Sequence, residues 1–242
     1  MTRNVILNND DHLDLTVRFA FGADFGDAVN LAPVFPTEFV EAARDYPLFL
    51  DRDGSGAWRT VALLGFDRDE NLFLDGDRWA ARYIPAAHRR GPFRIGFQGG
   101  TDGPAPVILL DLDDARIAPA GDPAGVRLFR DHGGHTPALD GVAAALRLLH
   151  DGVETAAALY AAWERCGLIE SVRLEVKLDG GTTYTITDLH TVSTTRLAGL
   201  DGEALATLNR ANFLAPAFLL AAAAGNVQHL IERRAHRDRP AA

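Results

Sequence analysis

Strand-like segments follow one another through the first half of the chain without a helix long enough to connect parallel strands. Apolar and polar residues alternate at 13–17 and at 93–97, and 107–112 is almost entirely apolar. A parallel connection needs a dozen or more residues, usually as a helix, whereas antiparallel neighbours need only a turn. We therefore predict an antiparallel sheet in the N-terminal half.

Turn residues mark where these strands reverse direction. The clearest hairpin pairs 46–50 with 58–66 across the Gly- and Asp-rich turn 51–56. The other elements expected in this half are a short helix at 35–44, a short strand at 71–74 and a hairpin loop at 99–104.

The second half is rich in Ala and Leu and changes to a helical pattern. An apolar repeat of 3.6 residues covers 139–149 and 153–163, and Asp151-Gly152 between them predicts two separate helices. Further helices are expected at 201–208 and within 212–235.

One hairpin interrupts these helices, because 172–178 and 182–187 alternate on either side of the turn 179–181. The expected fold is α+β, with an antiparallel sheet of the N-terminal half packed against Ala/Leu-rich helices of the C-terminal half. The 242 residues are predicted to form a single domain, with 1–120 and 136–242 as its lobes if it has two.

The charge of the chain argues against one class of partner. It has 33 acidic and 24 basic residues and a formal net charge of -9. An acidic surface repels phosphate backbones, so we predict no binding to nucleic acid.

Several features favour a cytoplasmic protein. Cys166 is the only cysteine, so no intramolecular disulfide can form. The N-terminus lacks the pattern of a signal peptide. The longest apolar run, 213–225, is too short to span a bilayer and contains Pro216. We therefore expect a cytoplasmic location and no membrane insertion, and leave export without a signal open.

A block of residues between Tyr46 and Phe93 forms a distinctive pattern. It comprises Tyr46-Pro47, Leu64-Gly65, Asn71-Leu72-Phe73, Trp79, Tyr83-Ile84-Pro85, Arg89-Arg90 and Pro92-Phe93. Leu128-Phe129 and Cys166-Gly167-Leu168-Ile169 extend the pattern. In these residues the chain resembles the SapC family of bacterial proteins.

The resemblance implies an accessory role. The name SapC comes from a surface-layer gene locus, and members resemble components encoded beside outer-membrane receptors and amino-acid-modifying enzymes. No catalytic residue is carried over by the resemblance. A peptide-transport permease with the same name spans membranes, so it differs from the protein expected here.

The same block supplies candidate ligand-binding residues. Aromatic and arginine side chains on turns framed by Gly and Pro suit recognition of a peptide or a carboxylate, through stacking and bidentate hydrogen bonds. The candidates are Asn71, Trp79, Tyr83, Arg89 and Arg90. In the alternative interpretation, the aromatic residues pack in the core and the arginines pair with Asp75 and Asp77.

The histidines suggest metal sites only in part. His12-Leu13-Asp14 has the spacing of a facial-triad iron site, but we expect His12 at the start of a strand, bonded to backbone or to an acidic neighbour. His12 remains a ligand-binding candidate. His132 and His135 would need Cys166 and His190 to complete a zinc site, and a solvated loop is favoured. We predict no catalytic residue, metal or cofactor.

The function predicted from the sequence is that of a non-catalytic accessory or binding protein that recognises a peptide or protein segment. The alternative is an iron- or zinc-dependent oxygenase or hydrolase. The last apolar helix either packs in the core or forms the contact of a homodimer.

Overall fold

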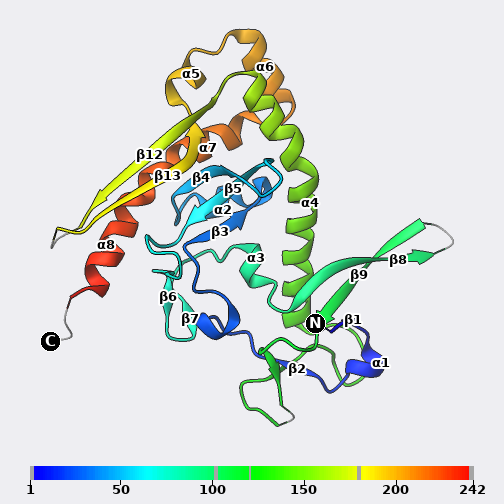
Figure 1. Ribbon diagram of the computed structural model, residues 1–242. Helices are drawn as coiled ribbons and strands as arrows, with labels where there is room; N and C mark the ends of the chain where they lie inside the picture. The colour runs from blue at the N-terminus through cyan, green and yellow to red at the C-terminus, as the bar shows by residue number, and fades with distance from the viewer. Residues whose placement is uncertain (1–2, 101–102, 120, 179–180, 240–242) are drawn as a thin grey trace. The chain divides into compact units, whose positions relative to one another are not determined.

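The computed structural model describes residues 3–100, 103–119, 121–178 and 181–239 (Figure 1). Helices and antiparallel strands alternate along it, which confirms the α+β fold. Every strand pairing within the described residues is antiparallel, as the short connections predict.

The chain forms two compact units, each assembled from separate segments. Unit 1 comprises 1–27, 74–79 and 86–150, and unit 2 comprises 28–73, 80–85 and 151–242. The division therefore interleaves along the sequence, unlike the continuous lobes that the change in composition suggests. The organisation as a single domain stays a prediction.

Unit 1 contains three small sheets and short helices. The strand order of the first sheet is β1-β9-β8, that of the second is β10-β2-β11, and β6 and β7 form a two-stranded hairpin. The strands are β1 (Asn4–Ile6), β2 (Thr16–Val17), β6 (Leu74–Asp75), β7 (Arg78–Trp79), β8 (Phe93–Gly100), β9 (Gly103–Asp111), β10 (Ile117–Ala118) and β11 (Val126–Arg127). The helices are α1 (Asn9–His12), η1 (Ala23–Phe25), α3 (Ala86–Arg89) and the part of α4 (Pro137–Arg165) up to residue 150.

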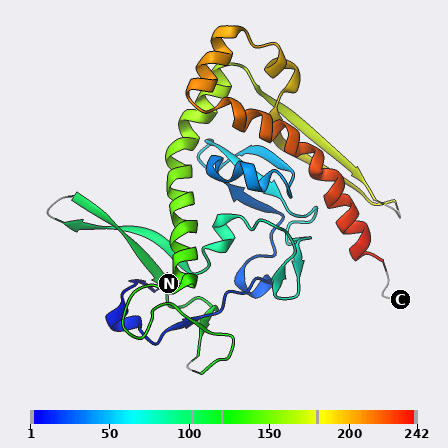
Figure 2. The ribbon, with the colours of Figure 1, turned by 180° about the vertical axis from the view of Figure 1, so that it is seen from behind.

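Unit 2 contains a five-stranded sheet of order β12-β13-β4-β5-β3. Its strands are β3 (Leu31–Val34), β4 (Leu48–Arg52), β5 (Trp58–Leu63), β12 (Ile169–Lys177) and β13 (Thr183–Val192). Helix α7 (Leu214–Ala223) packs against β4 and β13 (Figure 2). The other helices are η2 (Pro36–Glu38), α2 (Phe39–Ala42), the end of α4, α5 (Thr194–Ala198), α6 (Gly202–Arg210), α7 (Leu214–Ala223), η3 (Ala224–Asn226) and α8 (Val227–Arg237).

The expected hairpins are confirmed. Strands β4 and β5 pair from Leu48↔Ala62 to Arg52↔Trp58, and β12 pairs with β13 over nearly their whole length. The sheet of unit 2 therefore joins strands from both halves of the chain. Thr101 and Asp102 of one predicted loop, and Asp179 and Gly180 of the other, lie outside the described residues.

The prediction of two helices divided at Asp151-Gly152 is wrong, because α4 continues through both residues. A Cβ at position 152 would lie 2.4 Å from Cβ of Phe35 and 2.9 Å from Oγ1 of Thr37. The glycine thus allows the helix to approach the segment after β3 closely, instead of ending it.

Two local expectations also differ from the structure. The segment 71–74 is not a strand up to Leu74, because the Asn71 side chain accepts a hydrogen bond from the Phe73 N–H and forms a turn. His12 ends α1 and does not begin a strand, since Asn8 caps this helix by accepting from Asp10 and Asp11.

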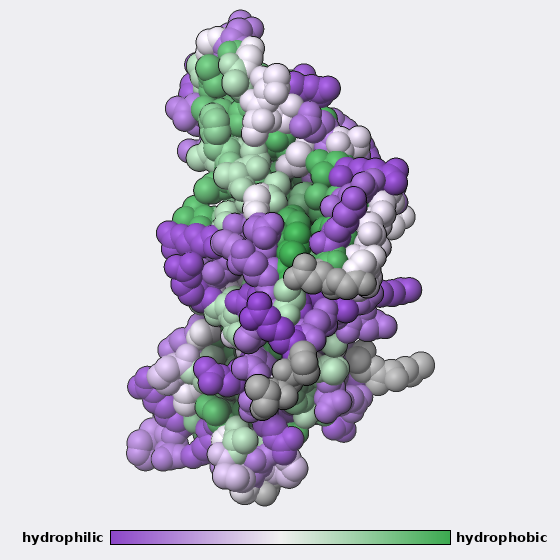
Figure 3. All heavy atoms as spheres, turned by 90° about the vertical axis from the view of Figure 1, so that its left-hand side faces the viewer, coloured by the Kyte–Doolittle hydropathy of each residue, from purple (hydrophilic) through white to green (hydrophobic). Residues whose placement is uncertain are grey.

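The C-terminal helices carry exposed apolar surface. By length and composition alone, Leu214–Arg237 could cross a membrane, and 22% of its most apolar window is buried. This is weak evidence for a span, because core helices of soluble proteins pass the same test. Phe218 on α7 is exposed, and Figure 3 shows apolar residues gathered on the surface of unit 2.

Candidate functional site

Two of the predicted ligand-binding residues lie in unit 2 and are tied into its fold. Asn71 is buried and forms the turn described above. The Tyr83 hydroxyl donates to the buried Glu38 carboxylate at 2.7 Å, and the Tyr83 N–H donates to Asp45 at 3.0 Å. The Tyr83 carbonyl also accepts from the Tyr46 hydroxyl. Each therefore has a structural contact in unit 2.

The other four predicted residues lie in unit 1. Trp79 is buried, and its ring contacts the rings of Phe21 and His88 at 5.6 and 5.0 Å between centroids. Arg89 ends α3. Burial lowers the pKa of the neighbouring Arg90, which donates to the Phe93 carbonyl at 2.8 Å.

His12 is also buried, with its Nδ1 3.1 Å from the carbonyl oxygen of Asn8. The expected contact of His12 with the backbone is thus present, although His12 lies in a helix and not at the start of a strand. The structure brings Trp79 and Arg90 into the same unit, while Asn71 and Tyr83 belong to the other. The ligand-binding role of all six residues stays a prediction.

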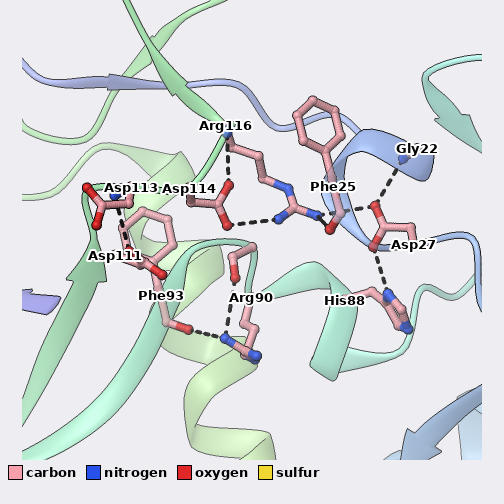
Figure 4. A network of polar contacts seen from close by, with 11 residues as sticks. Gly22, Phe25, Asp27, His88, Arg90, Phe93, Asp111, Asp113, Asp114 and Arg116 are labelled. Carbon is pink, nitrogen blue, oxygen red and sulfur yellow. Dashed lines mark hydrogen bonds and ion pairs between the residues drawn. The ribbon is translucent and has the colours of Figure 1, made fainter. Parts of the chain in front are cut away.

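A buried polar network in unit 1 was not expected from the sequence (Figure 4). Asp27 is 1% exposed, and its Oδ1 lies 2.7 Å from Nδ1 of His88. Its Oδ2 accepts from the N–H of Gly22 at 3.0 Å and from Nη2 of Arg116 at 3.2 Å. Nη2 of Arg116 also donates to the carbonyl of Phe25 at 3.0 Å.

This Asp27–His88–Arg116 network balances a buried carboxylate against a buried guanidinium. Asp27 fixes the orientation of the His88 ring through Nδ1, and leaves Nε2 as the ring nitrogen that could take part in other contacts. His88 and Arg116 lie 61 and 89 positions after Asp27 in the sequence, so no local pattern could predict this network. His88 does lie within the block that resembles SapC, which was the available signal.

An open groove of about 500 Å³ lies in unit 2 between α4 and the β3–β5 edge of the sheet. We call it the unit 2 groove. Its helical wall is one stripe of α4, formed by Val153, Ala156, Ala157, Tyr160, Ala161 and Glu164. The opposite wall comes from Pro33 to Phe35 and from the β4–β5 hairpin. Val153 is 58% exposed there, so apolar surface faces the solvent.

Polar contacts hold the mouth of the unit 2 groove in place. Nε1 of Trp58 donates to Glu164 at 2.9 Å, and the guanidinium of Arg52 lies 3.7 Å above the Trp58 ring. Arg59 forms a bidentate pair with Asp51, with distances of 2.6 and 2.8 Å. The partly exposed Trp58 ring is therefore held in one orientation, with Arg52 over its face and the centroid of the His190 ring 4.8 Å away.

The lining of the unit 2 groove contains two carboxylates, those of Glu164 and Asp53. Hydrogen bonds from the side chain and N–H of Ser55, and from the N–H of Ala57, hold the pKa of the Asp53 carboxyl below its usual range. The two lining carboxylates, Asp53 and Glu164, face one lining cation, Arg59, which also binds Asp51. Arg52, which is not part of the lining, pairs with Glu164 at 3.4 Å. The lining is acidic on balance.

The inner wall of the unit 2 groove carries a neutral polar pair. The hydroxyls of Tyr160 and Thr60 lie 2.8 Å apart, and burial raises the pKa of Tyr160 to about 12. The phenol therefore keeps its proton at neutral pH.

This pair predicts a loss of stability at high pH. The folded state holds the Tyr160 proton more tightly than the unfolded state, where the pKa is 10.0. The free energy of unfolding should therefore fall as pH rises from 10 to 12, by about 2–3 kcal/mol for this group. Urea unfolding at several pH values would show the decline, and Tyr160→Phe should lack this component. A difference between the two proteins that does not change with pH would contradict the assignment.

The open edge of the sheet limits how a ligand could bind. Strand β3 is the edge strand and contains Pro33, which has no N–H to donate to an added strand. A ligand in the unit 2 groove would therefore bind mainly through side chains rather than by extending the sheet.

Sequence reasoning missed this groove. The spacing of Val153, Ala156, Ala157 and Tyr160 was visible as an apolar repeat, but no local signal placed it beside β3 and β5. The structure does not bring the histidines together into a metal site. Within the described ranges, no group of three or more His, Cys, Asp or Glu could hold a metal ion.

Comparison with known proteins identifies the family. The family model described as SapC matches residues 7–230. No curated protein and no solved structure matches the chain.

Proposed function

The chain belongs to the SapC family, and we propose that it is a non-catalytic accessory protein that binds a peptide or protein segment in the unit 2 groove. The observation that carries the proposal is the exposed apolar stripe of α4 facing a ring held in place, Trp58. Open grooves with apolar walls and a few oriented polar groups are typical of ligand sites.

The charges indicate which segment fits best. The groove lining is acidic on balance, and the whole chain has a net charge of -9. A segment with apolar side chains flanked by Lys or Arg would bury its apolar groups against the Ala-rich wall and place its cations near Asp53 and Glu164.

The family resemblance suggests the setting of this binding. We propose a role beside surface-layer or outer-membrane-receptor systems, with the cytoplasm as the compartment in which the chain itself acts. The partner would be a basic, apolar segment of a component of such a system.

A pair of variants in α4 tests the groove. Ala157 lines the unit 2 groove, whereas its neighbour Ala158 is exposed and does not. We expect Ala157→Arg to weaken binding at least tenfold, because the long cationic side chain occupies the groove and repels a basic ligand. Ala158→Arg adds the same charge and should bind like the original protein.

Fluorescence anisotropy can measure the affinity of both variants for a labelled peptide. The peptide has a Leu-Phe-Leu centre and two Lys on each side. The same centre flanked by Glu should bind more weakly than the Lys peptide. The proposal is wrong if the Lys peptide does not bind, or if both arginine variants lose binding equally.

A further inference from the structure

A second groove lies entirely in unit 1 and is lined by residues of the β8–β9 hairpin and of the N-terminal half of α4. We call it the unit 1 groove; its volume is about 330 Å³. The hairpin contributes the cross-strand pairs Ile95↔Ile108 and Phe97↔Pro106. The helix contributes Ala143, Leu146, Arg147 and His150, which share one stripe.

The base of the unit 1 groove is apolar. Leu146 belongs to the hydrophobic core of unit 1, and Ile108 packs against that core. Phe97 is 57% exposed at the opening, with its ring centroid 5.8 Å from that of His150. Apolar surface that continues from a core to an exposed aromatic ring is typical of a ligand site.

The charge of the unit 1 groove is opposite to that of the whole chain. None of the described residues that line it is acidic, and its ionisable residues are Arg147 and His150. The chain as a whole has 33 acidic residues against 24 basic ones. Arg147 is exposed and forms no ion pair with a residue that the structure describes. An anion would be attracted to it without displacing a carboxylate of the protein.

We propose that the unit 1 groove binds an aliphatic carboxylate, of the size of a medium-chain fatty acid. The chain of the ligand lies on Ile95, Ile108 and Leu146, and its carboxylate pairs with the guanidinium of Arg147. The volume lies at the lower end of the range for ligand pockets, which favours a medium chain over a long one. The proposal does not depend on peptide binding in unit 2.

Calorimetric titration tests the proposal with octanoate, decanoate and dodecanoate below their micelle concentrations, and with decyltrimethylammonium as the cation of matched chain length. Affinity should rise about two- to fourfold for each added methylene, because each one buries apolar surface. Decanoate should bind much more tightly than the cation. Arg147→Gln should weaken decanoate about tenfold, and Phe97→Ala should weaken all three carboxylates.

The control is Arg130→Gln, which removes an exposed arginine of unit 1 outside the groove and should leave decanoate binding unchanged. Equal affinity for decanoate and the cation would overturn the proposal. So would the absence of saturable decanoate binding, or an equal effect of Arg147→Gln and Arg130→Gln. Because Arg147 is exposed, its replacement should leave the melting temperature nearly unchanged.

Discussion

Replacement of Asp27 by alanine should lower the free energy of unfolding by about 3–5 kcal/mol. The Asp27 carboxylate is buried and accepts from Gly22 and Arg116 while contacting His88. Its removal leaves the Gly22 N–H, Nδ1 of His88 and Nη2 of the buried Arg116 without this acceptor, and Asp114, which is less buried, as the remaining carboxylate partner of Arg116. Removal of one partner from a buried ion pair is one of the most costly single changes in a protein.

Urea unfolding followed by circular dichroism measures this loss. Asp27→Asn keeps an acceptor of the same shape but removes the charge, so its loss should be smaller than that of the alanine variant. Asp113→Ala removes an exposed carboxylate of the same unit and should change stability by less than about 1 kcal/mol. A loss of less than 1 kcal/mol for Asp27→Ala would show that the network does not stabilise unit 1.

Replacement of Gly152 by alanine should destabilise the protein by about 1–3 kcal/mol, although alanine is the better helix former. The new Cβ would lie 2.4 Å from Cβ of Phe35, an atom close to the backbone that cannot move without shifting the chain. The cost of this overlap should exceed the gain in helix propensity.

Gly141 provides the matched control, because it lies in the same helix with no atom within 4 Å of an added Cβ. Gly141→Ala should therefore raise the free energy of unfolding by about 0.5–1 kcal/mol. Opposite signs for the two variants are expected from thermal or urea unfolding. If Gly152→Ala also stabilises the protein, α4 does not approach Phe35 as closely as the structure indicates.

Local sequence patterns predicted the hairpins and one of the C-terminal helices. Alternation and turn residues placed the β4–β5 and β12–β13 hairpins, and the helix expected at 201–208 is α6. The same rules misplaced the break at Gly152, because a glycine that ends a helix and one that allows close packing look alike in sequence.

The candidate sites depend on contacts between distant segments, and no local pattern in the sequence indicates which segments come together. Trp58 and Glu164 are 106 positions apart, and Asp27 and Arg116 are 89 apart. Trp79 and Tyr83 stood out as aromatic residues on turns, but an aromatic ring in a turn region can equally pack inside, as Trp79 does. Trp58, on a predicted strand, was not singled out.

The most direct test of the account is the accessibility of Trp58 when the Lys-flanked peptide binds. The chain has three tryptophans, and Trp79 and Trp163 are buried, so Trp58 should account for most of the quenching by acrylamide. Saturating peptide is predicted to protect the fluorescence from acrylamide, and Ala157→Arg should abolish this protection. Peptide binding that leaves the quenching unchanged would contradict the assignment of the unit 2 groove as the binding site.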